Sequence, residues 1–284
     1  MVQRPCYARL VAGDVMSRLR ARVVPVASLG AAIIERMFTL FEEYYEEVAF
    51  EAFAADLSKK DDVILLVDGR GEVQGFSTMK NLTVEVGGRT VRGLFSGDTV
   101  VARAYWGQRV LGRAFLAYLF RKKARHPFAP YWWFLISKGF KTYLLMANNF
   151  EEYYPRPEGP TPPAEQAVLD AFASALYPGE YDPATGLISF DSSHGQVRRG
   201  VADITSELLE NPKIAHFQRK NPTWFRGTEL ACIARMTWSM PLYYTAKAYA
   251  KAIAARPRKV MAPSPEAMAP MRVAGAAASG EKTP

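Results

Sequence analysis

The segment spanning residues 94–120 constrains the fold more than any other part of the chain, because two hydrophobic patterns meet across a short turn that contains glycine. An apolar, β-branched run ending at Ala102 is typical of a strand. The sequence RVLGRA, from Arg109 to Ala114, then leads into an apolar run typical of a helix. A helix N-terminus exposes unpaired N–H groups, and a glycine there lets an anion approach the backbone. The segment therefore predicts a strand–turn–helix unit that binds a phosphate or pyrophosphate, with an extended group along the strand.

The neighbouring residues predict a succession of strands and helices around this unit. Gly87 and Gly88 indicate a hairpin turn between two long strands, 73–86 and 90–102. The other expected elements, in chain order, are an edge strand at 22–26, a helical region at 33–53 with a break near Glu46, a strand at 62–68, a strand at 131–136 and a helix capped by Ser137. Three antiparallel strands thus precede the RVLGRA turn, and one strand and one helix follow it.

Composition bounds the class of protein. The chain has 284 residues, of which 49% are hydrophobic and 23% charged, as in ordinary globular proteins. No apolar span is long enough to cross a bilayer, and residues 1–20 lack the core of a signal peptide, so we expect a cytoplasmic protein. Two isolated cysteines and three scattered histidines argue against a disulfide framework and a metal site.

The chain divides into four expected parts. Residues 1–20 form an N-terminal segment, and residues 21–158 form the core that carries the RVLGRA turn. A linker-like stretch, GPTPP, opens a third part, 159–255, which is expected to complete the fold and the acceptor side. This part contains an expected helix at 164–176, a short helix at 204–210, a strand at 229–236 and a basic amphipathic helix at 241–255. Residues 256–284, rich in Pro, Ala, Ser and Gly, are expected to be a disordered tail.

The RVLGRA turn, between the fourth strand and the next helix, resembles the Gln/Arg-x-x-Gly-x-Gly/Ala motif of the GNAT superfamily of N-acyltransferases. The resemblance covers roughly residues 21–154, with a weaker similarity at 229–236. It implies an α/β (α+β) fold with a mixed, mostly antiparallel sheet flanked by helices, and a helical C-terminal extension. It also implies transfer of an acyl group from a thioester to an amine.

The resemblance also implies an acyl-donor site. The backbone N–H groups of the turn would hold the pyrophosphate of coenzyme A, or the phosphate of a carrier protein's pantetheine arm, and the preceding strand would pair with the pantetheine amides. The donor-binding residues expected on this basis are Val100, Val101, Arg109, Leu111, Gly112, Arg113 and Ala114. A plain strand–turn–helix, with Gly112 selected for close packing, is the alternative.

Proton transfer needs further residues. Asp98 lies eleven residues before Arg109, where several family members carry a general base; a turn or bulge hydrogen bond after Gly97 is the competing role. Many members also use a tyrosine after the fifth strand to protonate the leaving thiolate. The usual pattern is not cleanly present here, and the candidates are Tyr143 first and Tyr154 second, with core packing as the alternative for both.

Aromatic and basic residues leave the size of the donor and the partner open. A fatty-acyl tunnel and an ordinary core both fit the aromatics, which are Trp106, Phe115, Tyr118, Phe120, Tyr131, Trp132, Trp133 and Phe134. A run free of acids contains Arg103, Arg109, Arg113, Arg121, Lys122, Lys123 and Arg125. That run could dock an acidic acyl carrier protein or the 3′-phosphate of coenzyme A, or be a solvated helix end.

Three functions are carried forward. The first is an N-acyltransferase that uses acyl-CoA or acyl-phosphopantetheine as co-substrate, without a metal, and takes a small-molecule or peptide amine as acceptor. The second is a non-catalytic acyl-thioester or lipid-binding module with the same fold. Nucleic-acid binding, suggested by the net charge of +8, ranks well below both because no base-reading motif is found. The 242–255 helix also fits peripheral membrane contact, although packing on the core is favoured.

Overall fold

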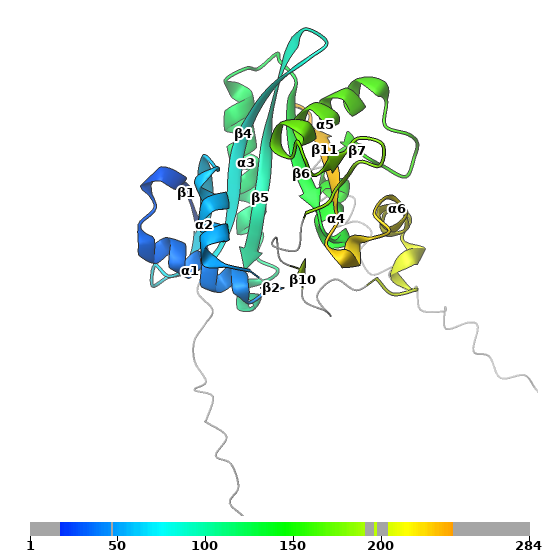
Figure 1. Ribbon diagram of the computed structural model, residues 1–284. Coiled ribbons are helices and arrows are strands. Elements are labelled where there is room, and N and C mark those ends of the chain that lie inside the picture. Colours follow the sequence, from blue (N-terminus) through cyan, green and yellow to red (C-terminus); the bar gives the residue numbers. More distant parts are fainter. Residues whose placement is uncertain (1–17, 47, 191–195, 198–203, 241–284) are drawn as a thin grey trace, which may run out of the picture. The chain divides into compact units, whose positions relative to one another are not determined.

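The computed structural model describes residues 18–46, 48–190, 196–197 and 204–240 (Figure 1). The chain separates into a unit of Met1–Tyr243 and a second unit, Tyr244–Pro284. The expected helix at 241–255, the expected tail at 256–284 and most of the segment 1–20 lie outside the described residues.

A mixed, mostly antiparallel sheet forms the centre of the first unit. Its strand order is β1-β3-β4-β5-β6-β11-β9-β8, with β7 paired to β11, and β5–β6 is its parallel pair. The bounds are β1 Arg20–Pro25, β3 Asp62–Val67, β4 Val73–Val86, β5 Arg89–Val101, β6 Tyr131–Ser137, β7 Tyr153–Tyr154, β8 Tyr181–Asp182, β9 Leu187–Ile188 and β11 Glu229–Arg235. Short strands β2 (Tyr45–Glu46) and β10 (Gln196–Val197) pair with each other. The expected fold class is confirmed.

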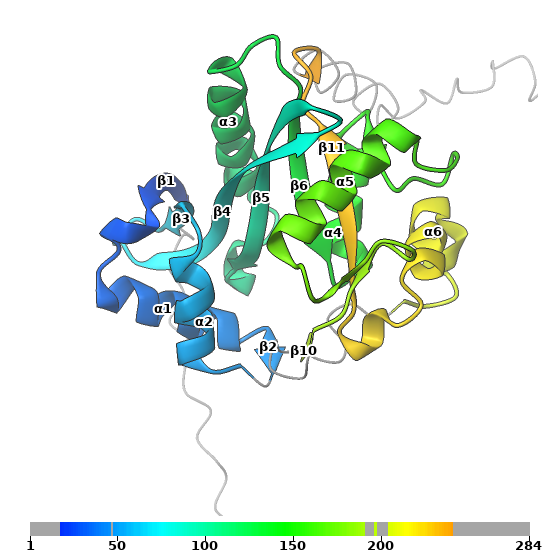
Figure 2. The same ribbon diagram turned by 45° about the horizontal axis from the view of Figure 1, so that its top comes forward.

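Helices cover both faces of this sheet (Figures 1 and 2). On one face lie α1 (Ala31–Glu42), α2 (Phe50–Ser58) and α5 (Pro163–Leu176); on the other lie α3 (Val110–Ala124) and α4 (Phe140–Asn149), with α6 (Pro212–Lys220) beside α4. Met37, Leu40 and Phe41 of α1 are buried at helical spacing against β3 and β4. Phe172 of α5 packs on Phe134 of β6, so the two ends of the sheet have separate hydrophobic clusters on the same face.

Most of the expected elements before residue 150 are confirmed. Gly87 and Gly88 have φ angles of 56° and 74°, as the two central residues of a type I′ hairpin require. The helical region expected at 33–53 is two helices, α1 and α2, and the short strand β2 separates them near the expected break.

Two local expectations were wrong, and one helix was missed. Ser137 does not cap α4; the N-cap is Gly139, and the Ser137 hydroxyl donates instead to the Gly139 carbonyl. The helix expected at 204–210 is only a 3-10 turn, Leu208–Glu210. Helix α6 was not expected, although Asn211 before Pro212 is a strong start signal, and the Asn211 side chain accepts a hydrogen bond from the Lys213 N–H.

The parallel pair β5–β6 separates partway along its length. The two strands pair with each other where Arg92–Phe95 lies opposite Tyr131–Phe134. Beyond these residues, β5 continues to Val101 and β6 continues to Ser137, and they no longer pair with each other. The backbone of β5 beyond Phe95 therefore has one side without a neighbouring strand. This divergence is where the candidate site lies.

Candidate functional site

A β-bulge in β5 opens the site. Ser77 of β4 pairs with Thr99 and Met79 pairs with Ser96, so β5 carries one residue more than β4 over this stretch. A Cβ on Gly97 would come within 2.5 Å of the Thr78 hydroxyl and 3.0 Å of the Lys60 side chain. Gly97 is therefore required for the close approach of β5 to β4, and the bulge places Asp98 at the divergence of β5 and β6.

Asp98 lines a cavity of about 240 Å³, which we call the bulge cavity. Its lining includes acids, lysines, hydroxyl groups and large apolar side chains. Its lining residues are Phe41, Tyr45, Asp56, Lys60, Phe95, Ser96, Gly97, Asp98, Thr99, Trp133, Leu135, Ile136, Lys138, Thr142, Leu145, Tyr177, Phe190 and Glu229. Residues from both sides of the strand divergence thus meet in one small space.

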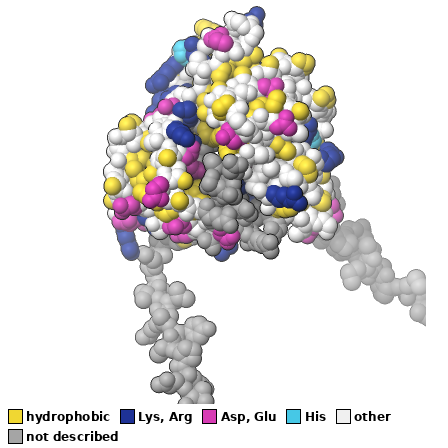
Figure 3. Space-filling model, in the orientation of Figure 1, with side chains coloured by type: hydrophobic (Ala, Val, Ile, Leu, Met, Phe, Trp, Pro, Cys, Tyr) yellow, Lys and Arg dark blue, Asp and Glu magenta, His cyan; other side chains and the backbone are white. Residues whose placement is uncertain are grey.

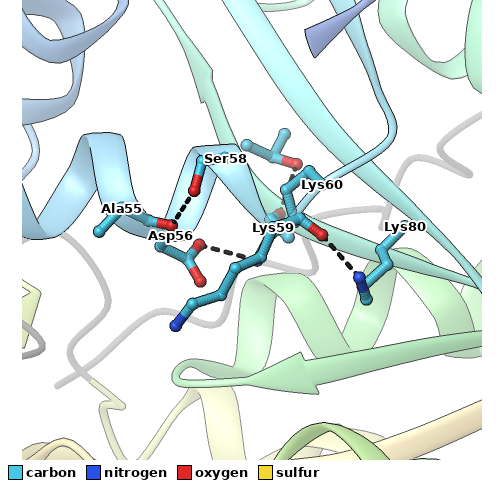
Figure 4. A network of polar contacts seen from close by, with 8 residues as sticks. Ala55, Asp56, Ser58, Lys59, Lys60 and Lys80 are labelled. Carbon is cyan, nitrogen blue, oxygen red and sulfur yellow. Dashed lines mark hydrogen bonds and ion pairs between the residues drawn. The ribbon is translucent and has the colours of Figure 1, made fainter. Parts of the chain in front are cut away.

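Two of the three acids in the bulge cavity are paired with lysines. Lys60 Nζ lies 2.7 Å from an Asp56 carboxylate oxygen, and the Lys60 side chain is only 6% exposed (Figure 4). Lys138 Nζ lies 3.4 Å from a Glu229 carboxylate oxygen, with both side chains largely buried. Within the described part of the chain, no hydrogen bond or ion pair holds the Asp98 carboxylate, so the expected alternative of a bulge hydrogen bond from Asp98 is not observed.

The surroundings of Asp98 raise its pKa to about 6. Burial is the main cause, because it disfavours the charged carboxylate, and the negative charge of Asp56 adds to it. Lys60 and Lys138 act in the opposite direction. A carboxylate with this pKa is ionised at neutral pH and accepts a proton more readily than an ordinary aspartate.

A second cavity of about 370 Å³, the loop cavity, adjoins the first. It is lined by the end of β5, the β5–α3 loop and residues near β2: Tyr44, Tyr45, Thr99, Val100, Val101, Tyr105, Trp106, Gly107, Gln108 and Leu111. Tyr45 and Thr99 line both cavities. A ligand in the loop cavity and a ligand in the bulge cavity would therefore meet beside Asp98.

The backbone of β5 presents alternate residues to the gap. The Ala102 N–H donates to the Gln74 carbonyl, so in this antiparallel ladder Val100 bonds to β4 while Thr99 and Val101 point away from it. The Val101 carbonyl accepts hydrogen bonds from the Tyr44 hydroxyl at 3.1 Å and from the Trp106 indole N–H at 2.7 Å. The expected pairing role of Val100 is thus wrong, and the groups that face the gap are those of Thr99 and the Val101 N–H.

The N-terminus of α3 follows the loop cavity. The first turn of α3 contains no acid, and Arg109 and Arg113 are exposed there together with Gly112. A Cβ on Gly112 would meet no atom of the described residues within 4 Å beyond its own helix turn, so the expected alternative of close packing is not observed there. Basic side chains at a helix N-terminus oppose the helix dipole unless an anion is present. Leu111 lines the loop cavity, whereas Arg109, Gly112, Arg113 and Ala114 surround the helix start next to it.

Neither candidate tyrosine lies in the site. Tyr143 is fully buried, and its hydroxyl donates to the Pro155 carbonyl at 2.9 Å. Tyr154 is 6% exposed in β7 and belongs to the cluster under α5. Neither lines either cavity, so the geometry favours the core-packing alternative for both tyrosines over the general-acid role. Tyr45 is the tyrosine that lines both cavities.

The aromatic residues do not form one tunnel. Trp106 lines the loop cavity and Trp133 lines the bulge cavity, where its indole N–H donates to the Ser96 hydroxyl. The six others line neither cavity; Trp132 and Phe134, for example, point to the opposite face of β6 and pack under α5. The observed arrangement therefore favours the ordinary core over a fatty-acyl tunnel.

The basic residues near the end of α3 are partly engaged. Lys123 is buried and donates to the Ala129 carbonyl, and Lys122 lies 3.6 Å from an Asp62 carboxylate oxygen. On the face drawn in Figure 3, basic and acidic side chains are interspersed over the described residues. Among those residues, no group of three or more potential metal ligands is found, and none of the helices is both long and apolar enough to span a bilayer.

Sequence reasoning missed four of the five charged residues described in the lining of the bulge cavity, all but Asp98. Lys60 lies two residues before β3, Lys138 follows β6, Glu229 is the first residue of β11, and Asp56 is one helical turn before Lys60. The available signal was that a charged residue bordering an apolar strand often lies at the edge of the sheet. The pairing of β11 with β6, which brings Glu229 to Lys138, was not predictable from those residues.

No protein-family model matches the chain, and no curated protein matches it. Among solved structures, a protein of unknown function from Enterococcus faecalis V583, described as a probable N-acyltransferase, shares 16% identity at a TM-score of 0.35, over 46% of this chain and 32% of that chain. A GNAT family N-acetyltransferase from Escherichia coli, in complex with CoA, shares 16% identity at a TM-score of 0.35, over 49% of this chain and 72% of that chain. A GCN5-related N-acetyltransferase from Kribbella flavida shares 17% identity at a TM-score of 0.34, over 47% of this chain and 34% of that chain.

The chain thus spans about a third of the length of the Enterococcus protein and of the Kribbella protein. At these TM-scores the likeness is partial, and the functional assignment stands on the two cavities instead.

Proposed function

We propose that this chain is a GNAT-like N-acyltransferase that moves an acyl group from a pantetheine thioester, as in acyl-CoA, to an amine. One observation carries the proposal. Asp98, a carboxylate with a pKa of about 6 and no partner among the described residues, lies in a cavity that adjoins a second cavity leading along β5 to the start of α3.

The loop cavity suits the donor. A pantetheine arm is a chain of amides, and the exposed backbone groups of Thr99 and the Val101 N–H offer it strand-like partners. The unpaired N–H groups in the first turn of α3, with Arg109 and Arg113 beside them, suit its phosphates. Gly112 leaves the space above that turn open.

The bulge cavity suits the acceptor. Asp98 takes the proton of the incoming amine, and the nitrogen then attacks the thioester carbonyl carbon beside Thr99. The C–N bond forms, the C–S bond breaks, and the sulfur leaves as a thiolate. Two protons leave the ammonium nitrogen as it becomes an amide. One passes to solvent, and the other neutralises the departing thiolate, either from protonated Asp98 or through the hydroxyl of Tyr45, which lines both cavities.

The donor is proposed to carry a short acyl group. The space beside Thr99 ends in the bulge cavity, which the acceptor must share, and the described aromatics do not form a tunnel for a long chain. Use of a carrier protein as donor and a cytoplasmic location stay predictions.

Thioester turnover tests the proposal. Acetyl-CoA, palmitoyl-CoA and an acyl carrier protein would be incubated with amines, and release of the free thiol measured. We expect turnover with acetyl-CoA and a loss of roughly 10²–10⁴-fold in kcat for Asp98→Asn with unchanged CoA affinity. Glu85→Gln is a matched control, because it removes an exposed carboxylate in the β4–β5 hairpin.

Two results would decide against an enzyme of this kind. Thioester binding without turnover, unaffected by Asp98→Asn, would identify the non-catalytic binding module. Failure to bind every thioester offered would exclude that module as well.

A further inference from the structure

The charged side chains that line the bulge cavity do not balance among the described residues, and the imbalance indicates which ligand would fit. In the described part of the chain, three carboxylates and two ammonium groups line the cavity. Asp56 pairs with Lys60 at 2.7 Å, and Glu229 pairs with Lys138 at 3.4 Å. The negative charge of Asp98 therefore has no positive counterpart among the described lining residues. A buried or partly buried charge is stable only with a partner, so one positive charge in the cavity completes the set.

Large apolar and aromatic side chains make up much of the remaining lining, together with the hydroxyl groups of Ser96, Thr99 and Thr142. The apolar wall consists of Phe95, Trp133, Leu135, Tyr177 and Phe190, and Lys60 Nζ lies 5.2 Å from the centre of the Phe95 ring. Aromatic rings accommodate both an apolar group and an ammonium group over a ring face. A body without further charge therefore suits the wall.

The volume limits the size of that body. At about 240 Å³, the cavity is smaller than the roughly 300–1,000 Å³ typical of sites for drug-sized ligands. It suits a single small molecule better than an extended one.

Resting on the proposed function, we infer that the acceptor is a small primary monoamine with an apolar or aromatic body and without a carboxylate or second cation. Its ammonium group pairs with Asp98 before deprotonation, and its body lies against Trp133 and Phe95. An amino acid would return the cavity to an excess of one negative charge, because both lysines already have acidic partners. A diamine would place its second cation against the apolar wall.

A matched set of acceptors tests this inference. With acetyl-CoA, kcat/KM would be measured by thiol release for 2-phenylethylamine, phenylalanine, phenylalanine amide, 1,5-diaminopentane and a lysine-containing peptide. Phenylethylamine and phenylalanine share an amine and a ring and differ by the carboxylate. We expect phenylethylamine to exceed phenylalanine, the diamine and the peptide by at least tenfold, with the amide close to phenylethylamine.

Asp56→Asn adds a second measurement. The substitution frees Lys60 to pair with a substrate carboxylate, so the disadvantage of phenylalanine should shrink at least fivefold, while kcat/KM for phenylethylamine changes less. Lys80→Gln is the matched control, because Lys80 bonds to the Lys59 carbonyl outside the cavity (Figure 4).

The outcomes separate the two proposals. Preference for phenylalanine, the diamine or the peptide would overturn the inference and leave the N-acyltransferase intact. Absence of turnover with every amine, despite binding of acetyl-CoA, would overturn the proposed function and the inference with it.

Discussion

The proposed catalytic role of Asp98 comes with a cost in stability. Burial is the main reason that its pKa is raised from 3.8 to about 6, and the charge of Asp56 contributes. A carboxyl group with a higher pKa in the folded state binds its proton more tightly when folded. As the pH rises from about 4 to about 6, the free energy of unfolding therefore falls relative to that of a protein with a neutral side chain of the same shape.

Asp98→Asn should accordingly stabilise the protein in a pH-dependent way. The stabilisation is absent below about pH 4, where Asp98 is protonated in both states, and grows up to about pH 6. Above pH 7 it should reach roughly 1–3 kcal/mol in the free energy of unfolding. Urea unfolding of both proteins from pH 4 to pH 8 measures this; a difference that does not vary with pH would show that Asp98 is not desolvated.

Tyr143 makes the opposite case, a tyrosine that looks functional by position but is structural. Its ring packs against Phe217 and His216, and its hydroxyl satisfies the Pro155 carbonyl. Position after a strand does not reveal whether a tyrosine points into the core or into a cleft, because that depends on which helix face the fold buries.

Tyr143→Phe should therefore reduce stability and leave catalysis intact. Loss of the hydroxyl leaves a buried carbonyl without its partner, which costs about 1–3 kcal/mol in the free energy of unfolding. Thermal unfolding measures this, and kcat should stay within about twofold of the unchanged protein at temperatures where both are folded. Tyr45→Phe is the informative comparison, because Tyr45 lines both cavities. A large loss of kcat in Tyr143→Phe alone would reverse the two assignments.

At the scale of elements, local signals predicted the parts that depend on neighbours in sequence. The double glycine at 87–88 requires a tight hairpin, and the RVLGRA turn starts α3 one residue after Arg109. A bulge hydrogen bond was one of the two roles predicted for Asp98. The surroundings that the bulge gives to the Asp98 carboxylate were not predicted. Whether Asp98 would be bonded or unpaired depends on Lys60 and Glu229, which reach it from other elements.

Gly112 in α3 allows the donor site to be tested without disturbing the fold. An alanine there meets no atom within 4 Å and improves helix propensity by up to about 1 kcal/mol, so thermal stability should be unchanged or higher. The added methyl group nevertheless occupies the space over the helix N-terminus. We expect the Kd for CoA to rise roughly tenfold, measured by titration calorimetry.

Gly159→Ala is the control for Gly112→Ala, because a Cβ on Gly159 also meets open space and lies in the linker before α5. Equal effects of the two substitutions on CoA affinity would mean that the start of α3 does not contact the donor. Tighter packing at Gly97 makes that glycine unsuitable as a control, since its Cβ would collide with Thr78.

At the scale of the whole molecule, the site depends on distant parts of the sequence. β11 pairs with β6 across about a hundred residues and supplies Glu229, while α2 and the short turn after it supply Asp56 and Lys60 from the other end of the sheet. Hydrophobic patterning predicted that these segments exist. It could not predict their order in the sheet, because many orders bury the same apolar faces.

The net charge follows directly from the sequence, and its effect on the binding of an anionic donor can be measured. The chain carries a net charge of +8, and two exposed arginines flank the start of α3, whereas a phosphorylated donor is strongly anionic. Salt screens such attraction, so the Kd for CoA should rise at least about fivefold between about 50 mM and about 500 mM salt. Arg113→Gln should reduce this dependence, because it removes a charge beside the phosphates. Arg89→Gln, an equal change of charge at the β4–β5 hairpin, should leave the slope nearly intact. If both variants lower the slope equally, the attraction comes from the overall charge rather than from the start of α3.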